Sequence, residues 1–386
     1  MRLFSGLLMV LTASFIVAEE DFTLQVEGVA EPILVDLPSN WEEGKSYPSI
    51  FFYHRTNGRP QTAFMREHAG EEDWTVVGMG YAERGKLQVS VPGIKAEVSV
   101  LKGVRDTLQK RSGLDLERVI ISGYNKGGWM SELMQQQQRW VAGSVVLQAG
   151  HLHQLQETLP SFRNPTPMFI GVGRLYANYP YALRAKVLYQ RLGAQVEMEV
   201  WEGVGHKLPR EGSEGLREWL QLRLGKKPDV AKLEEEWKEM ENLADYDRWQ
   251  AVMAFRQRPF VGEAGWEERV DAAQKEIEAI PEIAREVKIL KESRRWLSRE
   301  IGKRTYQDLK TIADGFGKIV KFAGESPQLE AAKKDFDRTS QVWELAKLRQ
   351  AELDEQQGSG ETEVGGGFGT GTRGRRTIPL GTPGFK

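Results

Sequence analysis

Residues 119–130 of the 386-residue chain read Val-Ile-Ile-Ser-Gly-Tyr-Asn-Lys-Gly-Gly-Trp-Met. The apolar, β-branched beginning predicts a buried strand, and the residues from Gly127 onward predict a helix. Glycines at positions 123, 127 and 128 predict a tight turn between them, because glycine lets two backbones approach closely. We call this turn, residues 123–128, the elbow. Asn125 stands at its centre.

On both sides of the elbow, short β-branched or aromatic runs alternate with helical patterns. This alternation predicts an α/β fold with a mainly parallel sheet flanked by helices. The predicted strands cover residues 49–54, 74–81, 119–122, 143–148, 168–172 and 196–201. The predicted helices cover residues 96–110, 127–139 and 179–192. Residues 22–26 and 33–37 predict a leading hairpin.

The strand, the glycine-flanked turn and the helix resemble the G-x-S-x-G elbow of serine hydrolases, in which small residues lift a nucleophile clear of the sheet. Residues 203–206, Gly-Val-Gly-His, match the Gly-x-Gly-His that delivers the general base of such enzymes. Residues 22–224 thus resemble the α/β-hydrolase fold, most of all its secreted esterase and depolymerase-like branch. The resemblance implies that His206 is the base and that His54 and Arg55 begin the oxyanion loop.

Three positions depart from that pattern. Asn125 takes the place of the nucleophile, and Arg55 stands where the oxyanion loop usually has glycine. Residues 174–179 replace the acid-bearing segment and contain no carboxylate, so that Asn178 or Tyr176 stands near the acid position. A carboxamide has no proton whose removal would create a useful nucleophile, although Asn tolerates a left-handed turn. We therefore expect a pseudoenzyme with a degraded catalytic triad.

The leading hypothesis is a secreted α/β-hydrolase-like protein that is catalytically inactive and acts as a binding or scaffolding module. Its cleft is expected to take a small ester, glycan or peptide. The candidate site residues are His206 as remnant base, Asn125 at the nucleophile position, Asn178 near the acid position, and Lys126, Arg55, His54, Tyr124 and Trp129 around the oxyanion loop and cleft.

Two alternatives stay open at this point. The first is an active carboxylic-ester hydrolase that uses displaced residues, with Ser122 or Ser131 as nucleophile and Glu202 orienting His206. The second is a helical interaction protein in which the hydrolase domain is only a carrier.

The composition of the chain excludes several kinds of chemistry. The chain has no cysteine, which excludes disulfides, thiolate catalysis and cysteine-ligated zinc. With 53 basic and 55 acidic side chains, it has no overall charge that would attract nucleic acid. His151 and His153 could ligate a metal, yet no third ligand accompanies them, so we predict no metal site. No cofactor is predicted, because the elbow lacks the spacing of phosphate-binding and dinucleotide-binding loops.

The sequence divides the chain into four predicted parts. Residues 1–18 read as a signal peptide, which predicts a secreted or periplasmic protein with no stable membrane span after cleavage. Residues 19–225 form the predicted α/β-hydrolase-like domain. Residues 226–357, rich in charged residues at helical spacing, predict a three- or four-helix antiparallel bundle that binds a protein partner. Residues 358–386 contain ten glycines and predict a disordered tail.

Tryptophans are expected to mark the core or the interfaces of the predicted bundle, because their large apolar rings gain most from burial. Those in the helical region that we expect there are Trp237, Trp249, Trp296 and Trp343.

Overall fold

The computed structural model describes residues 22–26, 29, 31–55, 57–83, 91–151, 166–301 and 306–358. The predicted signal peptide, and the predicted tail apart from Gly358, therefore lie outside the described residues. None of the described helices combines the length and the hydropathy that crossing a membrane requires.

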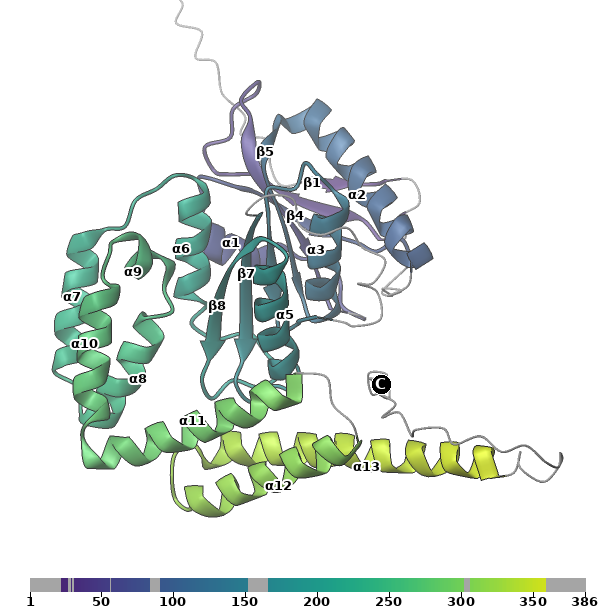
Figure 1. Cartoon of the computed structure of the whole chain (residues 1–386). Helices are drawn as coiled ribbons and strands as arrows, with labels where there is room; N and C mark the ends of the chain where they lie inside the picture. The colour runs from purple at the N-terminus through teal and green to yellow at the C-terminus, as the bar shows by residue number, and fades with distance from the viewer. Residues whose placement is uncertain are drawn as a thin grey trace, which may run out of the picture.

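Within the described residues, an eight-stranded sheet runs through the first half of the chain (Figure 1). Its strands are β1 (Phe22–Leu24), β2 (Ile33–Asp36), β3 (Tyr47–Tyr53), β4 (Thr75–Met79), β5 (Leu114–Tyr124), β6 (Gly143–Leu147), β7 (Thr166–Gly173) and β8 (Ala194–Trp201). They lie in the order β1-β2-β4-β3-β5-β6-β7-β8. β1 and β2 pair antiparallel, and β3 to β8 run parallel, which confirms the predicted sheet and its leading hairpin.

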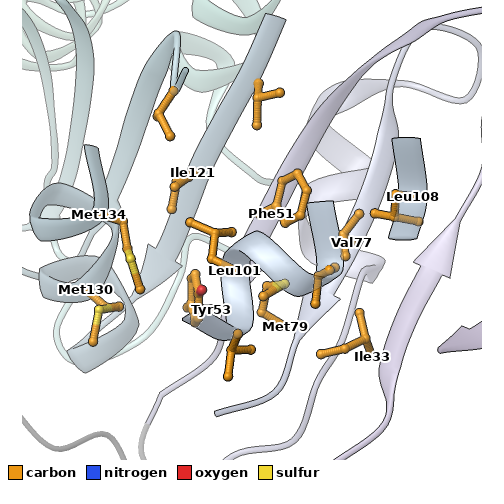
Figure 2. Close-up of a cluster of buried hydrophobic side chains, with 14 of the residues drawn as sticks. Ile33, Phe51, Tyr53, Val77, Met79, Leu101, Leu108, Ile121, Met130 and Met134 are labelled. Carbon is orange, nitrogen blue, oxygen red and sulfur yellow. The ribbon is translucent and has the colours of Figure 1, made fainter. Parts of the chain in front are cut away.

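Helices cover both faces of this sheet. They are α1 (Ala63–Ala69), α2 (Val91–Ser112), α3 (Lys126–Gln137), α5 (Tyr179–Arg191) and α6 (Glu214–Arg223). Alternate residues of β3 divide between the faces, as the two-residue period of a strand requires. Phe51 and Tyr53 pack with α2 and α3, as Figure 2 shows, whereas Ile50 and Phe52 pack with α1 and α6. Residues of β3 and β5 are buried throughout their central parts because helices cover both sides.

The second half of the described chain is helical. It comprises α7 (Val230–Glu241), α8 (Asp245–Phe255), α9 (Pro259–Glu263), α10 (Glu267–Glu278), α11 (Pro281–Ile301), α12 (Tyr306–Ala323) and α13 (Leu329–Gly358). The predicted helical region is therefore present, but the expectation of three or four helices was wrong. Seven are described, because α7 ends at Glu241 and α11 at Ile301, and because the short α9 lies between α8 and α10.

These helices form two groups. Trp237 and Trp249, both buried, share a core with α9, α10 and the start of α11. The rest of α11 packs with α12 and α13 against α5, and Leu297 and Phe316 join the core formed by α5, β7 and β8. Trp296 lies half-buried against that second core. The C-terminal helices thus reach the carboxyl-end loops of the sheet (Figure 1).

Candidate functional site

The elbow connects β5 to α3 and holds Asn125 in a strained conformation. Asn125 has φ 57° and ψ −117°, and few residues other than glycine adopt such a backbone. A Cβ atom added at Gly123 would lie 2.1 Å from the Gly127 carbonyl oxygen, and one added at Gly127 would lie 2.1 Å from the Tyr53 carbonyl oxygen. The glycines are therefore required for the backbone to turn this tightly.

Asn125 and His206 meet at the mouth of the elbow. The Asn125 Nδ2 atom donates hydrogen bonds to Tyr176 Oη at 2.7 Å and to His206 Nε2 at 2.8 Å. These two bonds use both hydrogens of the amide. Because Nε2 accepts, the imidazole is neutral with its proton on Nδ1. Burial, followed by the nearby positive charge of Arg55, lowers the pKa of His206 below its ordinary value.

Two tyrosine rings stack on His206. The Tyr176 ring lies 4.5 Å from the imidazole at an interplanar angle of 5°, and the Tyr124 ring lies 5.9 Å away at 18°. The Tyr124 hydroxyl also donates to the His206 carbonyl oxygen at 3.2 Å. Tyr176 thus covers a face of the imidazole ring, and its hydroxyl accepts a hydrogen bond from Asn125. A triad acid would instead bond the Nδ1 edge of the ring.

Gln148 holds the loop that carries His206, and the sequence analysis missed it. Its Nε2 atom donates to the carbonyl oxygens of Gly205 and Lys207, and its Oε1 accepts from the Gly173 N–H at 3.0 Å. Gln148 itself has a left-handed backbone, with φ 52°. A polar residue directly after the apolar strand β6 was the signal in the sequence.

The acid position contains no acid that reaches the base. Asn178 is buried and donates from Nδ2 to the Gln148 carbonyl oxygen at 3.0 Å, so it supports the Gln148 turn and not His206. Glu202 interacts electrostatically with Arg174, whose guanidinium is buried. Among the residues that the structure describes, no carboxylate is hydrogen-bonded to the His206 ring.

Arg174 is the first residue after β7 and is buried. Its guanidinium pairs with the buried carboxylate of Asp335 on α13, with an Nη2–Oδ2 distance of 2.5 Å. Asp335 also pairs with Arg338, which in turn pairs with Glu300 of α11. This charged chain ties the loop at the acid position to the C-terminal helices.

The residues expected around the oxyanion loop divide into surface and interior. Arg55 is exposed, while Tyr124 and Lys126 are half-buried around Asn125. His54, only 1% exposed, faces the interior, and its Nδ1 donates to the Arg55 carbonyl oxygen at 2.6 Å.

Trp129 was expected to line the cleft, which was wrong. It is only 5% exposed and packs in the core with Tyr179 and Ala182 of α5. One turn into α3, its side chain has already rotated away from the elbow.

The serines next to the elbow are also buried. Ser122 donates to the Met65 sulfur at 3.4 Å, and Ser131 donates to the carbonyl oxygens of Gly128 and Val145. Both hydroxyls are fully covered, so neither is presented at the apex. Displaced serine catalysis therefore has no geometric support at these two positions.

The histidines considered for a metal are not assembled into a site. His151 is buried against the ring of Tyr189, while His153 lies outside the described residues. Across the described ranges, no three His, Asp or Glu side chains are grouped to hold an ion.

A parallel sheet, an elbow after β5 and a histidine loop after β8 define an α/β-hydrolase fold. No family model matches the chain. Acyl-protein thioesterase 1 of Neurospora crassa is 26% identical over 140 residues, which is 34% of this chain and 57% of that protein. The chain thus matches little more than half the length of this curated relative. The similarity supports an esterase- or thioesterase-like hydrolase fold.

Solved structures of esterases also match part of the chain. A phospholipase/carboxylesterase from Dyadobacter fermentans is 13% identical with a TM-score of 0.39, covering 50% of this chain and 94% of its own. A carboxylesterase from Mesorhizobium loti is 20% identical with a TM-score of 0.42, covering 52% and 99%.

Proposed function

We propose that this chain is a non-catalytic α/β-hydrolase-like protein that binds an acyl ester or thioester at the elbow without cleaving it. One observation carries the proposal: Asn125 occupies the strained apex, and both of its amide hydrogens are committed to Tyr176 and His206. The carboxamide of Asn125 is not a nucleophile for a carbonyl carbon. The absence of a carboxylate on the His206 ring, within the described chain, supports the same conclusion.

The ligand class follows from the site and from the thioesterase similarity. Ester and thioester groups present a carbonyl oxygen, and the N–H groups at the start of α3 can donate to it. Arg55 and Lys126 add positive charge nearby. A glycan or a peptide is a weaker candidate, because the thioesterase similarity favours an ester or a thioester.

Binding without turnover is the direct test. The purified full chain is mixed with 4-nitrophenyl butyrate, and binding is followed by ligand-observed NMR while nitrophenolate release is followed by absorbance. We expect binding, no release above the buffer rate, and no labelling by a fluorophosphonate probe. His206→Ala should weaken binding, and Lys310→Ala, an exposed residue of α12, should not. Robust release that His206→Ala abolishes would falsify the proposal.

An active hydrolase with displaced residues remains the alternative to exclude by experiment. Mapping a fluorophosphonate adduct to Ser122 or Ser131 would support it, but both hydroxyls are buried and bonded within the protein. We therefore favour the non-catalytic function.

The helical region supports a second candidate role, contact with a protein partner. In the last part of α13, Leu345 and Leu348 are 52% and 61% exposed, although apolar side chains gain from burial. A pull-down with the full chain and with Leu345→Glu/Leu348→Glu tests this role. We further propose export of the protein, on the strength of residues 1–18, and fractionation of producing cells tests that separately.

A further inference from the structure

A second group of titratable side chains lies beneath the loop that follows β3. We call it the buried polar cluster; its members are Glu31, Tyr53, His54, Tyr81 and Glu97. Four of them, all except Glu31, are at most 2% exposed. They come from separate parts of the chain, namely the segment before β2, the end of β3, the segment after β4, and α2. The proposed binding site uses none of their side-chain chemistry.

Tyr81 holds the cluster together. Its ring stacks with Tyr53 at 5.8 Å and meets the His54 ring edge-on at 4.7 Å. Its hydroxyl donates to the His54 carbonyl oxygen. Next to it, Glu97 Oε1 accepts from the Ala82 N–H at 3.0 Å. After burial, the charge of Glu97 is the largest influence that raises the pKa of both tyrosines.

Four buried atoms of the cluster have no hydrogen-bond partner in the described protein: Glu31 Oε2, Tyr53 Oη, His54 Nε2 and Glu97 Oε2. His54 donates from Nδ1 to Arg55, so its Nε2 is an acceptor in the neutral ring. That Nε2 lies 3.6 Å from Glu31 Oε2, which is another acceptor. Of these four atoms, only Tyr53 Oη carries a hydrogen, and the other three are acceptors. The cluster lacks hydrogens, and buried acceptors require them.

We propose that the buried polar cluster is a proton and water site, in which one exchangeable proton on Glu97 and bridging water satisfy the four atoms and fix the loop after β3. Water suits this role because it donates two hydrogen bonds and accepts two. Burial raises the pKa of Glu97 to about 7, opposed only by the Ala82 N–H. No Lys or Arg side chain contacts this carboxyl in the described chain. Loss of the proton leaves a buried negative charge with no positive partner among the described residues.

The buried polar cluster lies next to the elbow. Its His54 begins the loop, and a Cβ at Gly127 would lie 2.8 Å from the His54 carbonyl oxygen, so loop and elbow backbones are in contact. Release of the proton near neutral pH is therefore expected to loosen the loop that carries Arg55. This inference does not depend on which ligand, if any, the elbow binds.

The first test compares the pH dependence of stability in three full-length proteins. Between about pH 4.5 and 7, the folded chain keeps a proton that the unfolded chain has lost, so stability falls as pH rises through this window. The expected change is about 300-fold in the folding equilibrium constant. Glu97→Gln, which has no such proton, should lose that component of the slope. Asp106→Asn, an exposed change on the same helix, should keep it.

A second measurement needs no variant. Carboxyl carbon NMR of the native chain should show Glu97 titrating near pH 7. The Gly58 N–H, which donates to the Arg55 carbonyl oxygen at 2.9 Å, reports on the loop. Its hydrogen exchange, corrected for the intrinsic pH effect, should rise over the same range. A Glu97 midpoint below pH 5, unchanged Gly58 protection, or equal slopes in native protein and Glu97→Gln would each overturn the proposal.

Discussion

Arg174 and Asp335 form a fully buried ion pair although 161 residues separate them in the chain. Arg174 directly follows β7, and Asp335 lies on α13. The pair therefore fixes the C-terminal helices to the loop that also carries Tyr176, the residue bonded to Asn125.

Removing one member of this pair should destabilise the protein strongly. Asp335→Ala leaves Arg174 buried without its partner, which typically costs about 3–5 kcal/mol. Urea unfolding followed by tryptophan fluorescence measures the loss. The double variant Arg174→Met/Asp335→Leu should recover much of it, because apolar side chains can replace a buried pair. Asp314→Ala, at the exposed pair with Lys310, should change stability by less than about 1 kcal/mol. Equal effects of the two aspartate variants would contradict the assignment.

Asn125→Ser should restore a nucleophile without restoring an efficient triad. The serine hydroxyl would take the apex facing His206 Nε2, but no carboxylate orients the imidazole. We expect slow fluorophosphonate labelling, and ester turnover roughly 10⁴-fold below that of a complete triad. Intact-protein mass spectrometry and nitrophenolate release provide the readouts. Asn125→Ala serves as the control and should neither label nor turn over ester. Absence of labelling in Asn125→Ser would show that the base or the oxyanion donors have also been lost.

Protonation of His206 should disrupt the site. Because its pKa is lowered in the folded state, the unfolded chain takes up this proton first as pH falls. Stability from this residue is therefore present above about pH 6.5 and declines as pH falls toward the lower folded pKa. Histidine NMR titration measures the shift directly. In Asn125→Asp, the new carboxylate should raise the pKa of His206, and a titration that does not move would exclude contact between the two side chains.

Loss of the Gln148 side chain should release the histidine loop. Gln148→Ala leaves the carbonyl oxygens of Gly205 and Lys207 without their donor, at a cost of about 1–3 kcal/mol. Hydrogen–deuterium exchange should increase for residues 203–208. Exposed Gln250 of α8 offers the comparison, since Gln250→Ala should leave this loop unchanged. Faster exchange in both variants, or in neither, would argue against the proposed support.

A methyl group at Gly127 should not be tolerated. The added Cβ would lie 2.1 Å from the Tyr53 carbonyl oxygen, so Gly127→Ala must displace either the elbow or β3. We expect destabilisation by about 3 kcal/mol or more, measured by thermal unfolding. Gly205→Ala is the matched control, because no atom lies within 4 Å of its added Cβ. A wild-type melting temperature for Gly127→Ala would mean that the elbow is looser than described.

The sequence predicted the sheet well because its signals are local. β-Branched runs such as Val119-Ile120-Ile121 favour a buried strand, and the glycines around Asn125 allow a tight turn. The structure contains both. The number of C-terminal helices was harder to predict. Prolines and glycines mark the boundaries near Pro259, Pro281 and Pro327. No proline or glycine separates α7 from α8, so that boundary has no such signal in the sequence.

The site was only partly predictable, because tertiary contacts complete it. The sequence pointed to Asn125 and His206, which the structure brings within hydrogen-bond distance. A polar residue directly after β6 marked Gln148, but the groups that it binds could not be predicted from the sequence. The pairing of Arg174 with Asp335 of a distant helix could not be predicted either. The prediction that Trp129 lines the cleft was wrong, because successive helix residues point in different directions and one position decides between surface and core.

Stacking on two phenol rings has a consequence for proton transfer. In acyl transfer, the imidazole takes the proton of the nucleophile at Nε2 and passes it to the leaving group. The His206 ring lies parallel to Tyr176 within 5°, and its Nε2 already accepts a hydrogen bond from Asn125. The atom that a hydrolase would use to carry a proton is therefore used here to hold the side chain of Asn125.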